Sequence, residues 1–201
     1  MPTHSTLFTQ APQWLKRRTG IRQNLPANVQ SWVYETGSLT QRLRCHFGSR
    51  LRVKILLQHW HKPFINERQL LRLPQAQYTL IREVLLYADS TPLILARSII
   101  PETTINVAHR NLSHLGTRPL GEVIFAYPNL QRLGLEITQL TLGAWREMCR
   151  NEFQIQQPVW GRRTVYAIPA QPLLVSEFFL PAVLDIGFVG QSKTDLMRDL
   201  G

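Results

Sequence analysis

Apolar and polar residues alternate along six stretches of this chain, and a period of two is typical of β-strands. Between the second and third stretches, Asp89-Ser90-Thr91-Pro92 has the composition of a tight turn, so these two strands are predicted to form a hairpin. The last two stretches, connected by Pro169-Ala170-Gln171-Pro172, are predicted to form another hairpin. The six stretches are residues 50–57, 78–88, 92–100, 133–137, 163–168 and 173–180.

Helical signals lie between these strands. Ser38 and Gln41 have the spacing of a capping box, in which each side chain satisfies a free amide at a helix start, so residues 39–47 are predicted to be helical. Apolar residues at helical spacing predict a second helix between residues 105 and 115. A third, short helix is predicted to begin near Leu120, after a proline that suits the first helical turn.

Short turns connect most of the sequential strands and few helices interrupt them, which favours an antiparallel sheet. The predicted fold class is therefore α+β, a single antiparallel sheet of about six strands with helices packed on one side. Residues 28–186 are predicted to form this one domain. Residues 1–27 are interpreted as a loosely ordered lead-in and residues 187–201 as a tail or short docking helix, and neither end is expected to carry chemistry.

Composition narrows the class of protein. With 201 residues, of which 44% are apolar, the chain is long enough for one buried core. Its two cysteines, Cys45 and Cys149, fit neither a disulfide framework nor a metal-binding pattern, so no metal is expected. No stretch is apolar enough for a signal peptide or a membrane span, so we expect a cytoplasmic protein without membrane insertion.

The net charge of +10 indicates an anionic partner, and a small anionic substrate, a nucleic acid or a membrane surface would each satisfy it. The best case for a nucleic acid is Lys16-Arg17-Arg18 and the basic segment 42–54, with Phe47 and Trp60 available to stack on bases. No aromatic RNA-binding motif or zinc pattern accompanies them, and basic strands are more often solvated faces. We therefore expect no nucleic acid partner.

Two charged residues interrupt strand faces that are otherwise apolar. Glu177 lies among apolar neighbours on the last strand, and Arg82 shares its face with Val84 and Leu86. A buried charge is costly unless it is paired, hydrated or turned toward a ligand. On the pattern alone, a structural Arg82–Glu177 ion pair, or an Arg82–Glu83 arrangement at a sheet edge, is somewhat favoured over a binding site.

Two helix starts add weaker candidates. The backbone amides of Leu39 and Leu120 lie in the first turns of predicted helices, where free N–H groups and the helix dipole attract anions. Most helix starts bind only their caps and water, so neither position identifies a site by itself.

Four strings in the same order and spacing resemble the chorismate pyruvate-lyases of ubiquinone biosynthesis, over residues 28–183. Together they are far more specific than any one of them alone. The resemblance implies the fold of that family, a six-stranded antiparallel sheet with helices that close as flaps over an internal ligand site. The strings are IREVLLYADSTPLILARSIIP (81–101), LGTRPLGEVIF (115–125), VWGRR (159–163) and PLLVSEFFLPA (172–182).

The resemblance also implies an activity, the conversion of chorismate to 4-hydroxybenzoate and pyruvate without a metal or an organic cofactor. Arg82 corresponds to the arginine that meets the ring carboxylate, Glu177 to the glutamate near the ring hydroxyl, and Leu120 to a leucine that binds through its backbone amide. Leu39 stands where the family has a methionine after a capping serine, and a backbone contact tolerates that change. We expect a monomer with chorismate and 4-hydroxybenzoate as small-molecule partners.

One alternative function and one departure from the family pattern remain. Effector-binding domains of some bacterial transcription regulators share this fold, so a non-catalytic domain that senses small aromatic acids is the main alternative. Residues 1–27 are too short and too interrupted by proline to supply a helix-turn-helix segment, which disfavours the sensing domain.

Residues 138–158 form a stretch longer than the family's turn, and its Trp145, Met148 and Cys149 are interpreted as packing residues.

Overall fold

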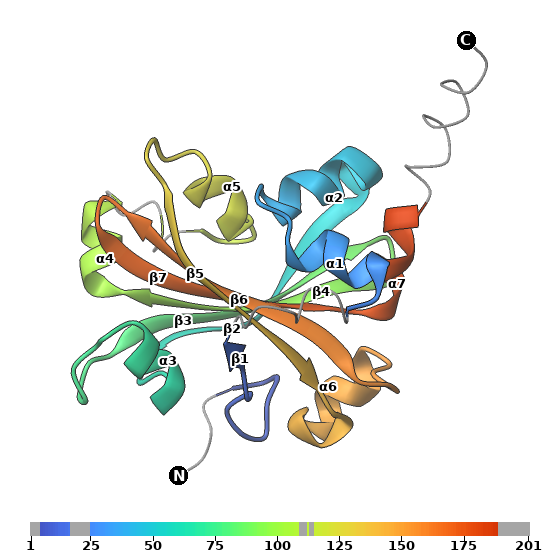
Figure 1. Cartoon of the computed structure of the whole chain (residues 1–201), viewed down its shortest axis with the longest axis horizontal. Helices are drawn as coiled ribbons and strands as arrows, with labels where there is room; N and C mark the ends of the chain where they lie inside the picture. Colours follow the sequence, from blue (N-terminus) through green and yellow to red (C-terminus); the bar gives the residue numbers. More distant parts are fainter. Residues whose placement is uncertain (1–4, 17–24, 109–111, 113–114, 189–201) are drawn as a thin grey trace.

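One antiparallel sheet organises the chain (Figure 1). The computed structural model describes residues 5–16, 25–108, 112 and 115–188. In this part the strands are β1 (Leu15–Lys16), β2 (Leu51–His61), β3 (Thr79–Ala88), β4 (Thr91–Pro101), β5 (Gln131–Leu140), β6 (Val159–Ile168) and β7 (Gln171–Phe179). They are hydrogen-bonded in the order β1-β5-β6-β7-β4-β3-β2, with every neighbouring pair antiparallel.

The α+β class and the six long strands predicted from the sequence are confirmed. They form two meanders, β2-β3-β4 and β5-β6-β7, which meet where β4 pairs with β7 in the middle of the sheet. The two-residue strand β1, which the alternation did not predict, extends the edge beside β5. The central strands β3, β4 and β7 therefore lie between neighbours on both sides, where charged side chains cannot reach a sheet edge.

Helices cover both faces of this sheet, which corrects the expectation that they pack on one side. Residues of α1, α2, α4, α5 and α7 bury against one face, whereas α6 and the end of α3 pack with the other. Figure 1 shows this division for α1, α2 and α5 above the sheet and α3 and α6 below it. Both faces of the central strands are apolar, so both need a cover. The helices are α1 (Ala27–Val33), α2 (Leu39–Phe47), α3 (Ile65–Leu70), α4 (Glu102–Val107), α5 (Leu120–Ile124), α6 (Glu147–Glu152) and α7 (Pro181–Leu184).

Part of the expected lead-in belongs to the core, which corrects its interpretation as loosely ordered. Leu7 and Phe8 are 0% exposed and pack with α6 and the sheet. Ser5 and Thr6 bind the carboxylate of Glu83 on β3. Residues 1–4 and 17–24 lie outside the described part of the chain, as do residues 189–201 of the expected tail.

The sequence signals at the two ends of α2 were interpreted correctly. Ser38 Oγ accepts a hydrogen bond from the amide of Gln41 at 3.3 Å, and α2 runs over the predicted residues 39–47. Gly48 ends it with a φ of 57°, a conformation that suits glycine. The helix predicted between 105 and 115 is shorter than expected, since α4 ends at Val107. Residues 109–111 and 113–114 of that prediction lie outside the described residues.

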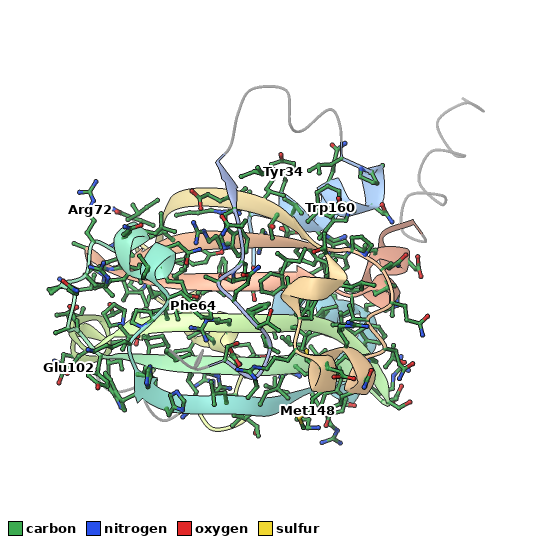
Figure 2. The ribbon with its side chains drawn as sticks, turned by 90° about the horizontal axis from the view of Figure 1, so that it is seen from below. Tyr34, Phe64, Arg72, Glu102, Met148 and Trp160 are labelled. Carbon is green, nitrogen blue, oxygen red and sulfur yellow. The ribbon has the colours of Figure 1, made fainter. Side chains whose placement is uncertain are left out.

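The long stretch 138–158 contains α6 and continues the core of the lower face. Trp145 and Cys149 are buried there, as expected of packing residues. Met148 is not, because the residue is 84% exposed, and Figure 2 shows it at the periphery of the molecule. Among the described residues, no helix combines the length and the apolar character that crossing a membrane requires.

Candidate active site

A narrow cavity lies between the upper face of the sheet and the starts of α2 and α5. All four residues singled out in the sequence, Leu39, Arg82, Leu120 and Glu177, line it. Arg82 comes from β3 and Glu177 from β7, while the two leucines are the first residues of their helices. The rest of the lining is mainly apolar, and consists of Thr40, Val53, Val84, Leu86, Ala96, Ser98, Pro119, Gly121, Ile124, Phe125, Tyr166 and Val175.

The two helices close tightly over this cavity. Its volume is about 40 Å³, which is room for a few water molecules. A Cβ atom on Gly121 would stand 3.1 Å from the hydroxyl oxygens of Ser38 and Thr40, so α5 touches the start of α2 at this glycine. Arg44 of α2 and Glu122 of α5 form an ion pair between the same helices. An aromatic ring therefore reaches the cavity only when α2 and α5 move apart.

Arg82 is a buried cation without a carboxylate partner among the described residues. Only 1% of the surface of Arg82 is exposed. Nη1 donates to the side-chain oxygen of Gln58 at 2.6 Å, and Nη2 donates to the carbonyl oxygen of Arg118 at 3.2 Å. Burial lowers the pKa of the Arg82 guanidinium, although arginine stays protonated at neutral pH. The structural Arg82–Glu177 ion pair that the sequence pattern favoured is therefore absent from the described structure, and that hypothesis is wrong.

The second structural hypothesis, an Arg82–Glu83 arrangement at a sheet edge, is also wrong. Strand β3 is internal, between β2 and β4, and consecutive side chains on it point to opposite faces. Glu83 lies on the lower face, where it accepts a hydrogen bond from Arg97 Nη1 at 2.7 Å. Arg82 lines the cavity on the upper face, so the two neighbours do not meet.

The other buried arginines of the sheet each have an acidic partner, in contrast to Arg82. Burial alone would lower the pKa of Arg97, but the carboxylates of Glu67 and Glu83 more than offset it and the pKa is raised. Arg163 pairs with Glu136 on the neighbouring strand β5. Arg162 pairs with Glu177. Sequence periodicity did not single out these pairs, because it gives the face of a side chain and not its neighbour across the sheet.

Glu177 lines the cavity, and one of its two carboxylate oxygens binds an arginine. Its Oε2 accepts a hydrogen bond from Arg162 Nε at 2.7 Å, and no group among the described residues donates to Oε1. The side chain is 15% exposed. Arg162 is the partner that the sequence reasoning missed. It lies in the VWGRR string and faces Glu177 directly across the β6–β7 hairpin.

Strand register sets the distance between the two charged residues of the cavity. Arg82 pairs with Ser98 and Glu177 pairs with Ala96, so they lie two strands and one row of side chains apart. Strand spacings of about 4.8 Å and rises of about 3.4 Å per residue put their Cα atoms about 12 Å apart. The two residues are therefore not direct cross-strand partners, and Glu177 faces Arg162 instead.

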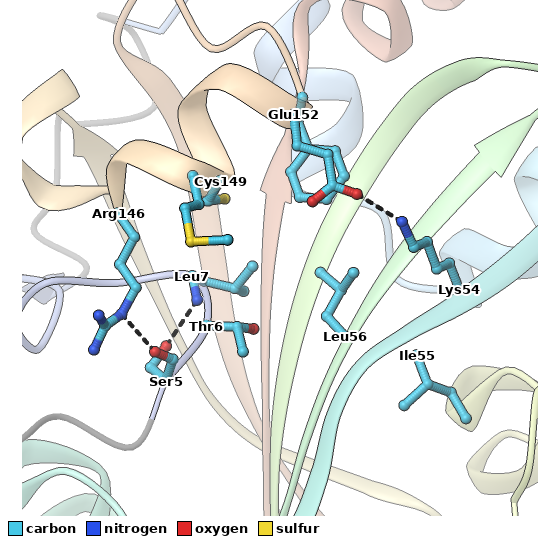
Figure 3. Close-up of a pocket in the computed structure, with 11 residues that line it drawn as sticks. Ser5, Thr6, Leu7, Lys54, Ile55, Leu56, Arg146, Cys149 and Glu152 are labelled. Carbon is cyan, nitrogen blue, oxygen red and sulfur yellow. Dashed lines mark hydrogen bonds and ion pairs between the residues drawn. The ribbon is translucent and has the colours of Figure 1, made fainter.

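A second, more open cavity lies on the lower face, between residues 5–7, β2 and α6 (Figure 3). It measures about 410 Å³ and includes none of the four predicted residues. Lys54 and Glu152 form an ion pair across it. Burial, followed by the carboxylates of Glu83 and Glu152, raises the pKa of the Cys149 thiol to about 12, so this cysteine is a poor nucleophile. Within the described residues, no three His, Cys, Asp or Glu side chains are grouped so as to hold a metal ion.

Comparison with solved structures supports the fold. The chain is similar to the transcriptional regulator PhnF from Mycobacterium smegmatis, with a TM-score of 0.54 and 11% identity over 74% of this chain and 66% of that chain. It is also similar to a transcriptional regulator of the GntR family from Bacillus cereus, with a TM-score of 0.52 and 12% identity over 67% of this chain and 94% of that chain. At these identities the likeness concerns the fold alone.

Comparison with known sequences identifies the family. The family model described as chorismate lyase matches residues 9–186. A probable chorismate pyruvate-lyase of Methylococcus capsulatus is 44% identical over 79% of this chain and 98% of that protein. Another, from Methylobacillus flagellatus, is 34% identical over 89% of this chain and 98% of that protein. The chain therefore belongs to the chorismate lyase family.

Proposed function

We propose that this protein is a chorismate lyase that eliminates pyruvate from chorismate and releases 4-hydroxybenzoate. The observation that carries the proposal is Arg82, a buried cation that lines a mainly apolar cavity and has no carboxylate partner among the described residues. A buried charge of this kind needs an anion from elsewhere, and the planar guanidinium suits a carboxylate. The family of the chain supplies the substrate.

We assign to the four lining residues the roles that the family resemblance implies. Arg82 and the backbone amides of Leu39 and Leu120 hold the ring carboxylate, while Oε1 of Glu177 accepts the hydrogen bond of the ring hydroxyl. The apolar lining contacts the two faces of the ring. The carboxylate and the hydroxyl stand at opposite ends of 4-hydroxybenzoate, in keeping with the separation of Arg82 and Glu177.

The reaction needs little covalent help from the protein. The bond between the ring carbon and the enolpyruvyl oxygen breaks, the hydrogen on the hydroxyl-bearing carbon leaves, and aromatisation drives the elimination. Either Glu177 removes this hydrogen as a base, or the enolpyruvyl group takes it up in a cyclic transition state while Glu177 orients the hydroxyl. Glu177→Gln distinguishes the two routes, because near-normal turnover of the purified variant would exclude the base.

The family also suggests the pathway and the cellular compartment in which the reaction takes place. We propose that the 4-hydroxybenzoate serves ubiquinone biosynthesis, that the reaction takes place in the cytoplasm and that it uses no cofactor. The alternative function, a domain that senses aromatic acids without catalysis, has the same fold and the same expected affinity for a carboxylate. It differs in one respect, since a sensing domain would bind 4-hydroxybenzoate without converting chorismate.

One assay separates the enzyme from the sensing domain. The purified protein is incubated with chorismate and a chelator, and 4-hydroxybenzoate and pyruvate are measured over time. We expect both products in equal amounts at a rate that the chelator does not change. Binding of 4-hydroxybenzoate with no conversion of chorismate would contradict the lyase and favour the sensing domain, and loss of turnover with the chelator would contradict cofactor independence.

A further inference from the structure

Arg162 is a buried cation that connects the cavity to the helix layer above it. The residue is 1% exposed. Its Nε donates to Glu177 Oε2 at 2.7 Å. Its Nη1 donates to the carbonyl oxygen of Glu35 at 2.7 Å and, at longer range, to those of Trp32 and Val33 at 3.3 and 3.2 Å. One guanidinium thus supplies donors both to a carboxylate of the cavity and to the last carbonyls of α1, which need partners outside the helix.

The strand register places the side chains of Arg162 and Glu177 side by side on the upper face of the sheet. Arg162 and Glu177 are direct partners across β6 and β7. Side chains at such paired positions have Cβ atoms about 5 Å apart, so their charged ends meet without bending the sheet. The contact uses only Oε2, and no described group donates to Oε1 of this cavity-lining residue.

The contact also decides the charge of the cavity. Arg162 neutralises Glu177, so the positive charge of Arg82 is left over for a ligand. Without Arg162, Arg82 would be the nearest cation lining the same cavity, and the Glu177 side chain would be drawn toward it. Such a pair would occupy both ends of the site at once.

We propose that Arg162 is a positioning residue that holds Glu177 by Oε2, turns Oε1 toward the ligand and so makes the site select a ring with a hydroxyl opposite its carboxylate. The inference rests on the proposed function, since it presumes that 4-hydroxybenzoate occupies the cavity. The hydrogen bond from Arg162 to the carbonyl of Glu35 also holds the segment that leads into Leu39, at the carboxylate end of the ring.

The test measures selectivity for the hydroxyl and not affinity alone. Dissociation constants of 4-hydroxybenzoate and of benzoate, which lacks the hydroxyl, are measured by calorimetry on the full chain. A hydrogen bond to a charged acceptor predicts that the wild-type protein binds 4-hydroxybenzoate about 10- to 100-fold more tightly than benzoate. In Arg162→Gln we expect this ratio to fall to about twofold or less, because Glu177 no longer presents Oε1.

Two further variants separate positioning from a loss of structure. Arg163→Gln removes the adjacent buried arginine, which pairs with Glu136 on the lower face, and we expect it to keep the wild-type ratio. In a Glu177→Gln background, Arg162→Gln should change the ratio no further, since the two residues act through one contact. Arg162→Lys keeps the charge but cannot reach both Glu177 and the carbonyls of α1, so its ratio should be intermediate.

A wild-type ratio in Arg162→Gln overturns the proposal. If that variant does not fold, the same result in Arg162→Lys overturns it. An equal loss of selectivity in Arg163→Gln also overturns it, because the effect would then be general. Failure of the proposed function looks different. In that case the wild-type protein itself would fail to convert chorismate, or would fail to distinguish 4-hydroxybenzoate from benzoate.

Discussion

Arg82 and Glu83 are neighbours in the sequence, yet they lie on opposite faces of the sheet in opposite electrostatic surroundings. On the lower face, Glu83 and Glu67 share the buried Arg97, and Glu83 also accepts hydrogen bonds from Ser5 and Thr6. On the upper face, the hydrogen-bond partners of Arg82 among the described residues are only the neutral oxygens of Gln58 and Arg118.

The difference shows how a buried charge can serve either the fold or a ligand. On the lower face, Glu67 and Glu83 have their cation within the chain, so these charges stabilise one packing arrangement and offer little to a small molecule. On the upper face, Arg82 has no carboxylate partner among the described residues, and burial lowers the pKa of its guanidinium. An anion bound beside Arg82 would therefore be stabilised. Stability and binding are thus expected to respond to different arginines.

The largest effect is expected at Arg97. Arg97→Gln would leave the carboxylates of Glu67 and Glu83 buried without their cation, so the free energy of unfolding should fall by about 3–5 kcal/mol. Urea denaturation followed by tryptophan fluorescence measures it. The matched control is Arg50→Gln, whose exposed pair with Asp89 is worth about 1 kcal/mol or less. An equally small change at Arg97 would contradict the structural role of the lower cluster.

The converse is expected at Arg82. Arg82→Met keeps the volume and removes the uncompensated cation, so binding of 4-hydroxybenzoate should weaken by about 1.5–3 kcal/mol, or about 10- to 150-fold in the dissociation constant. The free energy of unfolding should not fall, because Gln58 and Arg118 are exposed and water can replace the lost donors. Calorimetry and urea denaturation of the same preparation measure both. A large loss of stability with unchanged affinity would reverse the comparison of the two faces.

A smaller effect is expected where the cover of the upper face is tightest. In Gly121→Ala the new methyl group meets the hydroxyl oxygens of Ser38 and Thr40 at 3.1 Å, so α2 and α5 must separate slightly. We expect the Michaelis constant for chorismate to rise about fivefold, roughly 1 kcal/mol. Stability should be kept, since alanine favours a helix over glycine by up to about 1 kcal/mol. Gly134→Ala, where a Cβ meets nothing within 4 Å, is the control and should leave the constant unchanged.

The smallest effect is expected at the ion pair between Arg44 and Glu122. Both side chains are partly exposed, so the pair contributes about 0.2–1 kcal/mol and weakens with salt. Arg44→Glu should speed the release of 4-hydroxybenzoate up to about fivefold in stopped-flow experiments at low salt. The double exchange Arg44→Glu with Glu122→Arg should restore the slow release. If the double variant releases product as fast as the single one, the pair does not hold the cover.

Much of the architecture could be predicted because hydrophobic periodicity and the residues that begin or end helices are local features of the sequence. Ser38, Gln41 and Gly48 determine where α2 begins and ends, and alternation located the six long strands. Residues 5–8 escaped prediction, because a short apolar segment without a period gives no sign of the core that it joins. The roles of Leu39, Arg82, Leu120 and Glu177 stay predictions, although the fold brings all four to one cavity.

The cross-strand partners of Arg82 and Glu83 could not be predicted, because a bulge in β4 sets them. The β3–β4 turn alone, with Tyr87 opposite Pro92, would place Arg82 opposite Arg97. One extra residue, Leu93, shifts the register so that Arg97 faces Glu83 instead. The carbonyl of Leu93 accepts a hydrogen bond from the amide of Leu180, beyond the end of β7, so the bulge depends on a contact between distant segments.

By itself, then, the sequence determined the class of fold, the faces of Arg82 and Glu177 and the motifs that the family shares. These properties depend on residues near one another in the chain, where a period of two or a capping pair is enough. Only the tertiary structure decided that Glu177 pairs with Arg162 while Arg82 keeps its charge for a ligand. The physical reason is register, because a shift of one residue between two strands exchanges every neighbour of a buried charge.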